Sequence, residues 1–552
     1  MTAAIPSSWD QVVDVLVLGS GAAGLSAAVA AHDGGAETLV LEKARLIGGT
    51  AGVSGGIIWI PLNRHMAAAG ISDSREEALE YIRRLTLGSE PDPALVETYV
   101  DRAHDVAEYL EDNTPLQLMV SSSFTDYYAD LPGGKPEGGR SLESEPFDAR
   151  AALGAESPKV RTSPHLAWLT LDEGAKALIG GDVPADLAAQ RERDDVRVIG
   201  SALVASLYRG LLDRGVEVVT GVRGDELVRD DDGAIVGAVV LRDGARQAIG
   251  ARRGVVIATG GFEWNPELVK AFIGEPVEPM SPPHNEGDGL RMAMEAGAAL
   301  GNMRAFWGQP ALMDPNAEFE GERMIEMGGA RAIPGVVVVN GHGRRFVNEA
   351  VSYQDFPKAV AAFDPVAVEH PNHDHWMVYD QRLKDAAAIL PSMPAGEPAP
   401  DWVHRGETIR ELAEDAGIDP DGLEATIERW NAHVASGHDP DFGRGSAWYE
   451  AFMTGGPTPA VLAPVQQGPF YAMRMLHGAL GTNGGPRITV DGEVRDLRGG
   501  TIEGLYAAGN AAAAPLGDSY PGGGATLGPA LTFGFLAGRH AAGQPARLAT
   551  DA

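Results

Sequence analysis

The sequence predicts an α/β protein in which a Rossmann-like domain is interrupted by an inserted α+β domain. An apolar, β-branched run at residues 14–18 is followed by a glycine-rich turn, an alanine-rich segment and a second apolar run at residues 37–41. This is the order of a βαβ unit. Apolar runs paired with glycines return at residues 254–261 and 504–510. Between residues 305 and 470 the chain changes character and holds most of the tryptophans, so we expect a second domain there.

The composition excludes several functions. The chain has 552 residues, 44 basic and 77 acidic side chains, a formal net charge of −33 and no cysteine. Without cysteine it cannot form disulfides, thiolate-bound zinc sites, iron–sulfur clusters or a cysteine nucleophile. No two histidines have the His-x-x-x-His spacing, and we expect no metal site. The acidic balance disfavours nucleic acid as a partner. With no secretion signal and no membrane span, we expect a cytoplasmic protein.

The turn after the first apolar run carries a dinucleotide-binding pattern. Gly19 permits a tight turn, Gly21 lets the backbone approach a pyrophosphate, and Gly24 lets the helix pack closely on the strand. The helix begins at this turn, so its free N–H groups and its dipole favour phosphate. Glu42 ends the second run, where an acidic residue can accept hydrogen bonds from a ribose. The predicted contacts here are Gly19, Gly21, Ala22, Ala23, Gly24, Glu42 and Lys43.

Three further glycine-rich segments favour FAD over NAD. Small residues at 48–50 and 54–56 follow the second run closely and let the backbone approach a long cofactor. The run at 254–258 ends in a glycine turn, and the run at 504–510 ends in a polar residue. A domain that binds only a nicotinamide dinucleotide does not need this last element. The sequence therefore predicts FAD, with further contacts from Gly49, Thr50, Ser54, Gly55, Gly56, Ala258, Thr259, Gly260, Asp288, Gly509 and Asn510.

The order of these segments predicts how the domains are organised. We expect a discontinuous FAD-binding domain at residues 1–304 and 471–552, and a catalytic domain at residues 305–470. Amphipathic patterns between residues 75 and 118 predict helices. The Gly-, Pro- and Ser-rich stretch at 119–165 predicts a loop.

Four stretches resemble a known flavoprotein superfamily. They are SGGIIWIP at 54–61, GRRFVNE at 343–349, LGTNGG at 480–485 and SYPGGGATLG at 519–528. They resemble the fumarate reductase and 3-ketosteroid dehydrogenase superfamily, and within it most closely the 3-ketosteroid Δ1-dehydrogenases. The second stretch is shared across the superfamily, whereas the last is much more specific. Related succinate and fumarate enzymes often attach FAD through a histidine beyond the second strand. Residues 50–54 contain no histidine, so non-covalent FAD is expected.

The resemblance implies a reaction and roles for individual residues. It implies 1,2-desaturation of a 3-ketosteroid, with hydride passing from carbon 1 to flavin N5 and a proton passing from carbon 2 to a tyrosine. The Tyr520 hydroxyl and the Gly524 N–H would polarise the carbonyl as an oxyanion-hole pair. Tyr353 would be the base, assisted by Tyr127 or Tyr128, of which we prefer Tyr127. At the start of the closing helix, Ala525 and Leu527 would face the flavin ring.

Other functions remain open at this point. A fumarate-type or enone reductase would need arginines to clamp carboxylates, and Arg331 and Arg345 lie in suitable segments. A 3-keto-5α-steroid 4-dehydrogenase would act on the 4,5 bond, and a flavin carrier would have no catalytic role. The expected partners are a small-molecule ketosteroid and, because no second nucleotide motif is visible, a quinone or a similar electron acceptor.

Overall fold

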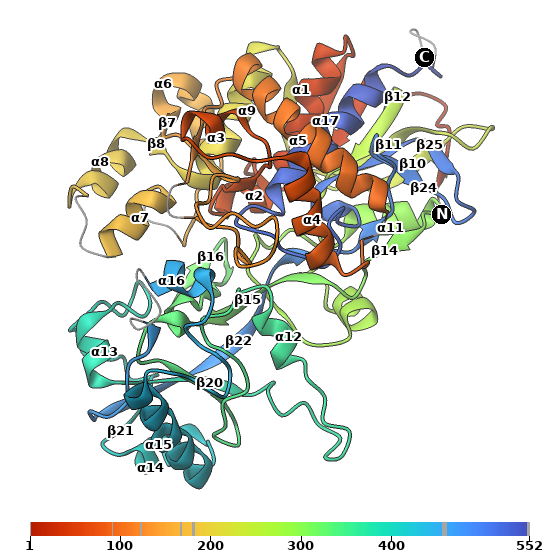
Figure 1. Cartoon of the computed structure of the whole chain (residues 1–552). Coiled ribbons are helices and arrows are strands. Elements are labelled where there is room, and N and C mark those ends of the chain that lie inside the picture. The colour runs from red at the N-terminus through yellow and green to blue at the C-terminus, as the bar shows by residue number, and fades with distance from the viewer. Residues whose placement is uncertain are drawn as a thin grey trace.

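The computed structural model describes residues 2–90, 92–121, 124–165, 168–178, 183–454 and 461–548. Within this part of the chain, two large sheets anchor two bodies that lie one above the other in Figure 1. Both termini lie on the upper body. The upper body combines the first half of the chain with its C-terminal segment, so residues far apart in sequence share one layered unit. The predicted α/β class is confirmed.

The central strands of the upper sheet are continuous apolar runs, and these runs become buried when helices pack on the sheet. This burial explains why the sheet forms. β2 pairs in parallel with β3 and β12, and β12 pairs in parallel with β25. The acidic turn at residues 230–233 joins β10 and β11 as an antiparallel hairpin. The nine strands are β1 (Ala3–Ala4), β2 (Gln11–Leu18), β3 (Thr38–Glu42), β9 (Glu217–Thr220), β10 (Val222–Arg229), β11 (Ile235–Arg242), β12 (Ala245–Ile257), β24 (Glu493–Arg495) and β25 (Thr501–Ala507).

Two helices far apart in sequence pack against each other beside this sheet. They are α1 (Ala22–Asp33) and the closing helix α17 (Leu527–Ala542). Their backbones approach closely, because a Cβ at Gly534 would lie 2.3 Å from the Ala23 carbonyl oxygen. This contact brings the N-terminus of α17 beside the glycine turn after β2. The other helices of this body are α2 (Gly49–Val53), α3 (Arg64–Ala68), α4 (Arg75–Thr86), α5 (Pro93–Asn113), α7 (Leu171–Leu178), α8 (Leu187–Asp194), α9 (Ile199–Asp213), α10 (Pro266–Leu268) and α11 (Asp288–Glu295).

The segment 119–165 is not the plain loop that its composition predicts. It contains β6 (Ser141–Ser144), β7 (Phe147–Asp148) and α6 (Ala149–Leu153). β6 is buried between β4 (Ile58–Trp59) and β5 (Leu118–Val120) in a three-stranded sheet. Its residues, Ser-Leu-Glu-Ser, lack apolar alternation, so the strand depends on its two partners rather than on its own propensity.

The lower sheet is centred on the long strand β22 (Phe470–Thr482), which crosses the predicted boundary at residue 470. β13 (Glu278–Pro279) also joins it from before residue 305. The limits of the two domains stay a prediction. The other strands are β15 (Phe306–Leu312), β18 (Glu326–Met327), β19 (Val337–Asn340), β20 (His375–Asp380) and β21 (His404–Gly406). The helices here are α12 (Phe356–Val360), α13 (Gln381–Ala386), α14 (Ile409–Ala416), α15 (Pro420–Ser436) and α16 (Trp448–Thr454).

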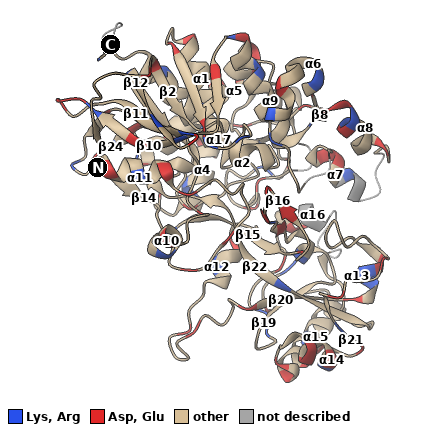
Figure 2. Ribbon diagram, turned by 180° about the vertical axis from the view of Figure 1, so that it is seen from behind, with Lys and Arg blue, Asp and Glu red and all other residues tan. Residues whose placement is uncertain are grey.

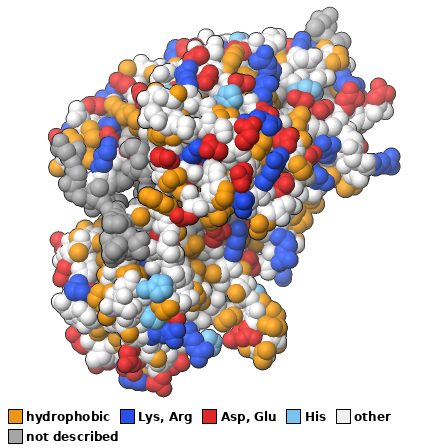
Figure 3. Space-filling view, viewed as in Figure 1, with side chains coloured by type: hydrophobic (Ala, Val, Ile, Leu, Met, Phe, Trp, Pro, Cys, Tyr) orange, Lys and Arg blue, Asp and Glu red, His pale blue; other side chains and the backbone are white. Residues whose placement is uncertain are grey.

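Charged side chains lie mainly on the outside of both bodies. Figure 2 shows acidic and basic residues along the outer helices, while the central strands of the upper sheet are largely uncharged. On the face seen in Figure 3, the two signs are interspersed. None of the described helices is both long enough and apolar enough to cross a lipid bilayer.

Candidate active site

One cavity joins the glycine turn after β2 to a group of tyrosines, and its volume is about 710 Å³. Of the predicted site residues, only Gly24 and Ala525 are not part of its wall. Those that line it are Gly19, Gly21, Ala22, Ala23, Glu42, Lys43, Gly49, Thr50, Ser54, Gly55, Gly56, Tyr127, Ala258, Thr259, Gly260, Asp288, Tyr353, Gly509, Asn510, Tyr520, Gly524 and Leu527. Residues from at least eight separate segments of sequence therefore share one space.

The glycine turn has the shape of a pyrophosphate cradle. A Cβ at Gly21 would meet no protein atom within 4 Å, so this position opens onto the cavity. Gly19 has φ +107°, and a Cβ there would lie 2.3 Å from the Ala258 carbonyl oxygen. Gly24 lies behind the wall, where a Cβ would be 2.0 Å from the Gly19 carbonyl oxygen. Each glycine thus fits the purpose predicted for it, and α1 directs its N-terminus at the space where phosphate would lie.

A charged group lies at the end of β3. Glu42 accepts hydrogen bonds from the Ser20 N–H at 3.0 Å and the Ser20 hydroxyl at 2.6 Å. The Lys43 ammonium is 2.8 Å from Asp288, which opens α11. Burial raises the pKa of Asp288, but the Lys43 and Arg223 cations outweigh this effect and hold it below its usual value. The lowered pKa keeps Asp288 ionised at neutral pH, and the carboxyl oxygens of Glu42 and Asp288 can accept hydrogen bonds from the hydroxyl groups of a ribose.

Two side-chain hydrogen bonds hold the far wall of the cradle, and in each of them the sequence predicted only one of the two partners. The Asn285 side-chain amide donates to the Thr50 hydroxyl at 2.9 Å. The Trp307 indole N–H donates to the Asn510 side-chain oxygen at 3.0 Å. Neither Asn285 nor Trp307 belongs to a glycine motif, so no local pattern marks them. They fix the polar residues Thr50 and Asn510 beside the cavity, and the whole cradle suits a long dinucleotide such as FAD.

Four tyrosines from four separate segments meet at the other end of the cavity. The ring centroid of Tyr127 lies 5.5 Å from that of Tyr353, 5.7 Å from Tyr520 and 4.5 Å from Tyr449. The Tyr353 and Tyr520 centroids are 5.4 Å apart. Tyr127, Tyr449 and Tyr520 are buried and Tyr353 is half-buried. The sequence predicted three members of this tyrosine cluster, and Tyr449 is the member that it missed.

The hydroxyl groups of the tyrosine cluster form a hydrogen-bonded network. Burial raises the pKa of Tyr353 well above its ordinary value, and its hydrogen bonds with Tyr127 and Tyr520 raise it further. Burial also raises the pKa of Tyr520, while hydrogen bonds with Tyr353, Thr526 and the Gly524 N–H oppose that rise. The Tyr520 hydroxyl and the Gly524 N–H are therefore direct neighbours. Together they form the donor pair that a carbonyl oxygen would require.

Gly524 precedes α17 in a conformation that suits glycine. Its φ is +97°, and a Cβ there would lie 2.5 Å from the Ile57 carbonyl oxygen. Leu527 opens α17 and lines the cavity, whereas Ala525 is buried behind it among the tyrosines. The expectation that both residues face the flavin therefore has geometric support only for Leu527.

The loop that carries Tyr127 is tied down on both sides. The Tyr127 N–H donates to the Pro521 carbonyl at 3.0 Å. Its neighbour Asp126 accepts hydrogen bonds from the Trp59 indole at 2.7 Å and from Arg140 at 2.8 Å. The adjacent Tyr128 directs its hydroxyl to Asp355. Of the two tyrosines left open by the sequence, Tyr127 is therefore the one beside Tyr353.

With this geometry in place, comparison with known proteins gives the family. A family model described as an FAD binding domain matches residues 14–527. The chain belongs to this FAD-binding family. FAD is its cofactor, and the predicted cofactor is confirmed.

Individual relatives of this flavoprotein cover nearly the whole chain. The "4-oxocyclohexanecarboxylate 2-dehydrogenase" of Sinomonas cyclohexanicum is 40% identical and covers 97% of this chain and 93% of its own. The "3-oxosteroid 1-dehydrogenase" of Mycobacterium tuberculosis is 33% identical and covers 97% of this chain and 99% of its own.

A solved structure agrees with these relatives. The 3-ketosteroid delta1-dehydrogenase from Sterolibacterium denitrificans, in complex with 1,4-androstadiene-3,17-dione, matches with a TM-score of 0.89 and 34% identity. The match covers 96% of this chain and 99% of that one. The flavoprotein is an FAD-dependent oxidoreductase, and these similarities support dehydrogenation of a ketone-bearing substrate.

Two arginines considered for a carboxylate clamp do not line the cavity of the flavoprotein. Arg345 pairs with Glu349 at 2.7 Å and with Asp439 at 2.9 Å. Arg331 is buried and donates to main-chain carbonyls. Arg161 does line the cavity, but Glu320 binds its guanidinium at 2.6 and 2.9 Å. A dicarboxylate clamp built from Arg331 and Arg345 therefore has no geometric support.

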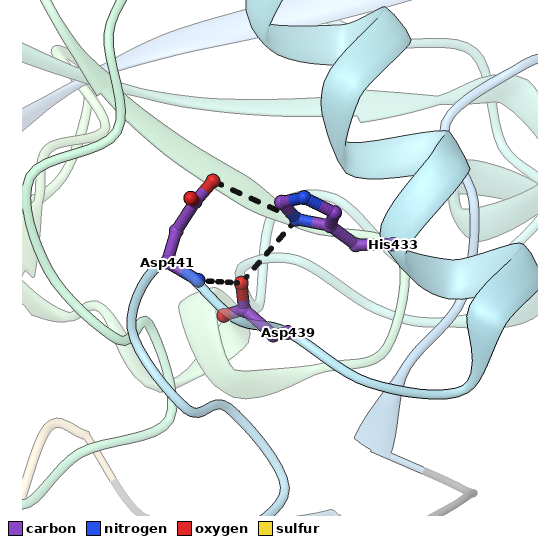
Figure 4. Close-up of side chains that lie close together, drawn as sticks. All are labelled: His433, Asp439 and Asp441. Atoms are coloured by element: carbon purple, nitrogen blue, oxygen red, sulfur yellow. Dashed lines mark hydrogen bonds and ion pairs between the residues drawn. The ribbon is translucent and has the colours of Figure 1, made fainter.

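A histidine–carboxylate cluster lies in the lower body, at the end of α15 (Figure 4). His433 Nδ1 lies 3.5 Å from Asp439 and 3.6 Å from Asp441. Each carboxylate already has an arginine partner, because Arg345 binds Asp439 and Arg429 binds Asp441. The two negative charges are thus balanced without an ion, and we assign no metal to this cluster.

Proposed function

We propose that this flavoprotein desaturates a ring ketone between the α-carbon, next to the carbonyl group, and the adjacent β-carbon. The observation that carries the proposal is the meeting of Tyr353, Tyr520 and the Gly524 N–H at the end of the FAD cavity. A proton on carbon next to a carbonyl is acidic only when the developing enolate charge is stabilised. The site supplies donors for that charge and a tyrosine whose phenolate can take the proton.

Each residue has a defined task in this reaction. Tyr520 and the Gly524 N–H donate to the carbonyl oxygen and stabilise its negative charge. Tyr353 takes the proton from the carbon next to the carbonyl, and Tyr127 hydrogen-bonds with the Tyr353 hydroxyl and orients it. When bound, FAD supplies the acceptor for the hydride that leaves the next carbon. The products are an enone and reduced cofactor, so protons and electrons balance.

A 3-ketosteroid, desaturated between carbons 1 and 2, is our first candidate substrate. Much of the wall around the tyrosine cluster is apolar, with Trp307, Met280 and Leu480. A neutral steroid suits such a wall because its burial is favourable and leaves no charge unpaired. The similarity to the S. denitrificans enzyme supports the same substrate class.

A smaller ring ketone is the second candidate. The relative that is 40% identical is named for 4-oxocyclohexanecarboxylate, and its identity exceeds that of the steroid enzyme from M. tuberculosis. The reaction would be the same, because this compound is also a ring ketone. The two candidates differ in size and charge, not in the use of the tyrosines.

Anaerobic bleaching of the flavin tests both candidates. The purified yellow protein is mixed without oxygen with androst-4-ene-3,17-dione in one arm and with 4-oxocyclohexanecarboxylate in the other. We expect rapid loss of the flavin band in at least one arm, with a new double bond next to the carbonyl group of the product. Product analysis with a 5α-3-ketosteroid, which has no 4,5 double bond, separates 1,2- from 4,5-desaturation. Absence of bleaching with any ring ketone, together with saturable fumarate reduction by a viologen donor, would reverse the proposal in favour of a reductase.

We also propose that FAD is held without a covalent bond and that a quinone or a similar compound reoxidises it. Residues 50–53 form part of α2 beside the cavity and include no histidine. Acid precipitation should therefore release yellow flavin into the supernatant. A pellet that keeps its flavin would contradict this. Turnover with a soluble quinone under nitrogen tests the acceptor.

A further inference from the structure

Arg331 is a buried cation immediately behind the tyrosine cluster, and the reaction proposed above does not use it. It lies in the short 3₁₀ turn Gly329–Ala332 and is 1% exposed. Its guanidinium donates to the Glu349 carbonyl and, at 2.9 Å, to the Val351 carbonyl. Both acceptors belong to the segment that leads directly into Tyr353. Arg331 therefore fixes the backbone that carries the proposed base.

The charge of Arg331 has no carboxylate partner among the described residues. It forms no ion pair within 4.0 Å with any residue that the structure describes, and no described residue hydrogen-bonds with its Nε. Glu349 is near, but Arg345 and Arg444 bind its carboxylate. Burial lowers the pKa of Arg331 to about 10, which still leaves it cationic at neutral pH. Burying a cation without a carboxylate partner costs free energy. A residue buried at this cost is a candidate for a functional role.

The tyrosine that faces this cation is Tyr449. Burial raises the pKa of Tyr449 to about 12, and the Arg331 charge and a hydrogen bond from the Tyr353 N–H oppose the rise. Tyr449 lies against Tyr127, which hydrogen-bonds with Tyr353. The other charged groups around this set are Arg444 and Glu349 beside Arg331, and Asp355 beside Tyr449. Arg331 is not part of the cavity wall, so its positive field reaches the tyrosine cluster from behind that wall.

We propose that Arg331 is a positioning residue for proton abstraction: it holds the Tyr353 segment through two carbonyls and places an unpaired positive charge that favours a phenolate in the tyrosine cluster. The inference rests on the proposed desaturation. A phenol is a poor base near neutral pH because little of it is ionised, and burial lowers the fraction of phenolate further. A nearby cation increases the fraction of phenolate at a given pH, so the proton transfer becomes faster on the acidic side of the base's pKa.

The test separates the charge of Arg331 from its structural contacts. R331M removes the charge and keeps an apolar side chain of similar length, whereas R331K keeps the charge and changes the contacts. R444Q is the matched control, because Arg444 is equally buried in the same region but is paired with Glu349. Flavin content and melting temperature are recorded for every variant. A second neutral variant, R331Q, replaces R331M if the latter does not fold.

Two measurements report how the rate of proton abstraction depends on pH. One is anaerobic flavin reduction in a single turnover with the ring ketone that the wild type accepts. The other is exchange of the α-hydrogens with D₂O on enzyme whose flavin has been reduced with dithionite, where only proton transfer occurs. We expect R331M to shift the rising limb of both pH–rate profiles to higher pH by about one unit. At pH values below the limb, the rate should then be up to about tenfold lower than that of the wild type. R331K and R444Q should leave the limb in place.

The outcomes are distinct. If R331M is slower but its limb stays in place, Arg331 is only structural and the inference is wrong. The same holds if R331K moves the limb as far as R331M does, because charge is then not the cause. If the wild type neither bleaches nor exchanges hydrogens with any ring ketone, the proposed desaturation itself fails.

Discussion

The dinucleotide cradle and the tyrosine cluster share one cavity, yet they are built in opposite ways. The cradle is made of backbone and small residues, and its key contacts fall in short contiguous stretches such as Gly19–Ala23. The tyrosine cluster is made of side chains from four segments that lie between residues 127 and 520. Changes in the cradle should therefore alter cofactor binding, whereas changes in the cluster should alter chemistry and leave the cofactor in place.

Replacing the proposed base tests this division with the largest expected effect. Y353F removes the hydroxyl that accepts the substrate proton. General-base catalysis contributes about 100- to 10,000-fold to a reaction rate. We therefore expect kcat to decrease by a factor in that range. The measurement is anaerobic flavin reduction with the accepted ring ketone.

The matching control for Y353F is the visible spectrum of the bound flavin, which should stay unchanged. Loss of flavin from Y353F would contradict the separation of cradle and cluster. A normal rate would remove Tyr353 from the mechanism and would favour a flavin carrier or a different base.

Removal of the carbonyl donor should have the next largest effect. Y520F leaves the Gly524 N–H as the remaining donor of the pair. Loss of one oxyanion-hole donor costs about 100- to 1,000-fold in kcat, and we expect a loss of that size with little change in KM. Steady-state kinetics measures both constants. A rise in KM alone would mean that Tyr520 binds the substrate without stabilising the enolate.

A substitution in the cradle should produce the opposite result. G19A introduces a Cβ that would lie 2.3 Å from the Ala258 carbonyl oxygen, at φ +107°. We expect at least about a tenfold loss of FAD affinity, which corresponds to 1.4 kcal/mol. Fluorescence titration of the apoprotein with FAD measures it.

A second glycine provides a matched control for G19A. Gly35 also has a positive φ, +84°, but a Cβ there would meet nothing within 4 Å. G35A should therefore cost only the backbone strain, about 1 kcal/mol of stability, and should retain FAD. Equal loss of FAD in both variants would show that strain, not the close approach of backbone, is the cause.

The same contrast explains how much the sequence could predict. The parallel strands and the cradle were predictable because backbone recognition requires glycines at fixed spacing after an apolar run. β6 was missed because its polar residues form a strand only between two partners. Asn285 and Trp307 were missed because their partners, Thr50 and Asn510, lie more than 200 residues away.

Within the tyrosine cluster, prediction depended on resemblance to a family rather than on spacing. Tyr353 and Tyr520 lie in or just after stretches that resemble the family. Tyr449 lies at the start of α16 in a segment without such a stretch. Its place beside Tyr127 follows from the packing of α16 near the 3₁₀ turn that carries Arg331, and no local pattern encodes that contact.

The smallest expected effect distinguishes two adjacent tyrosines. Tyr127 hydrogen-bonds with Tyr353 inside the cluster, whereas the Tyr128 hydroxyl binds Asp355. Y127F removes a partner that orients the base without removing the base, so we expect a fall in kcat of about tenfold, as for one hydrogen bond of 1.4 kcal/mol. Y128F should change kcat by less than about twofold, because its hydroxyl does not face the proton path. Equal effects from both substitutions would mean that the loop acts as one structural unit, and the specific role of Tyr127 would be lost.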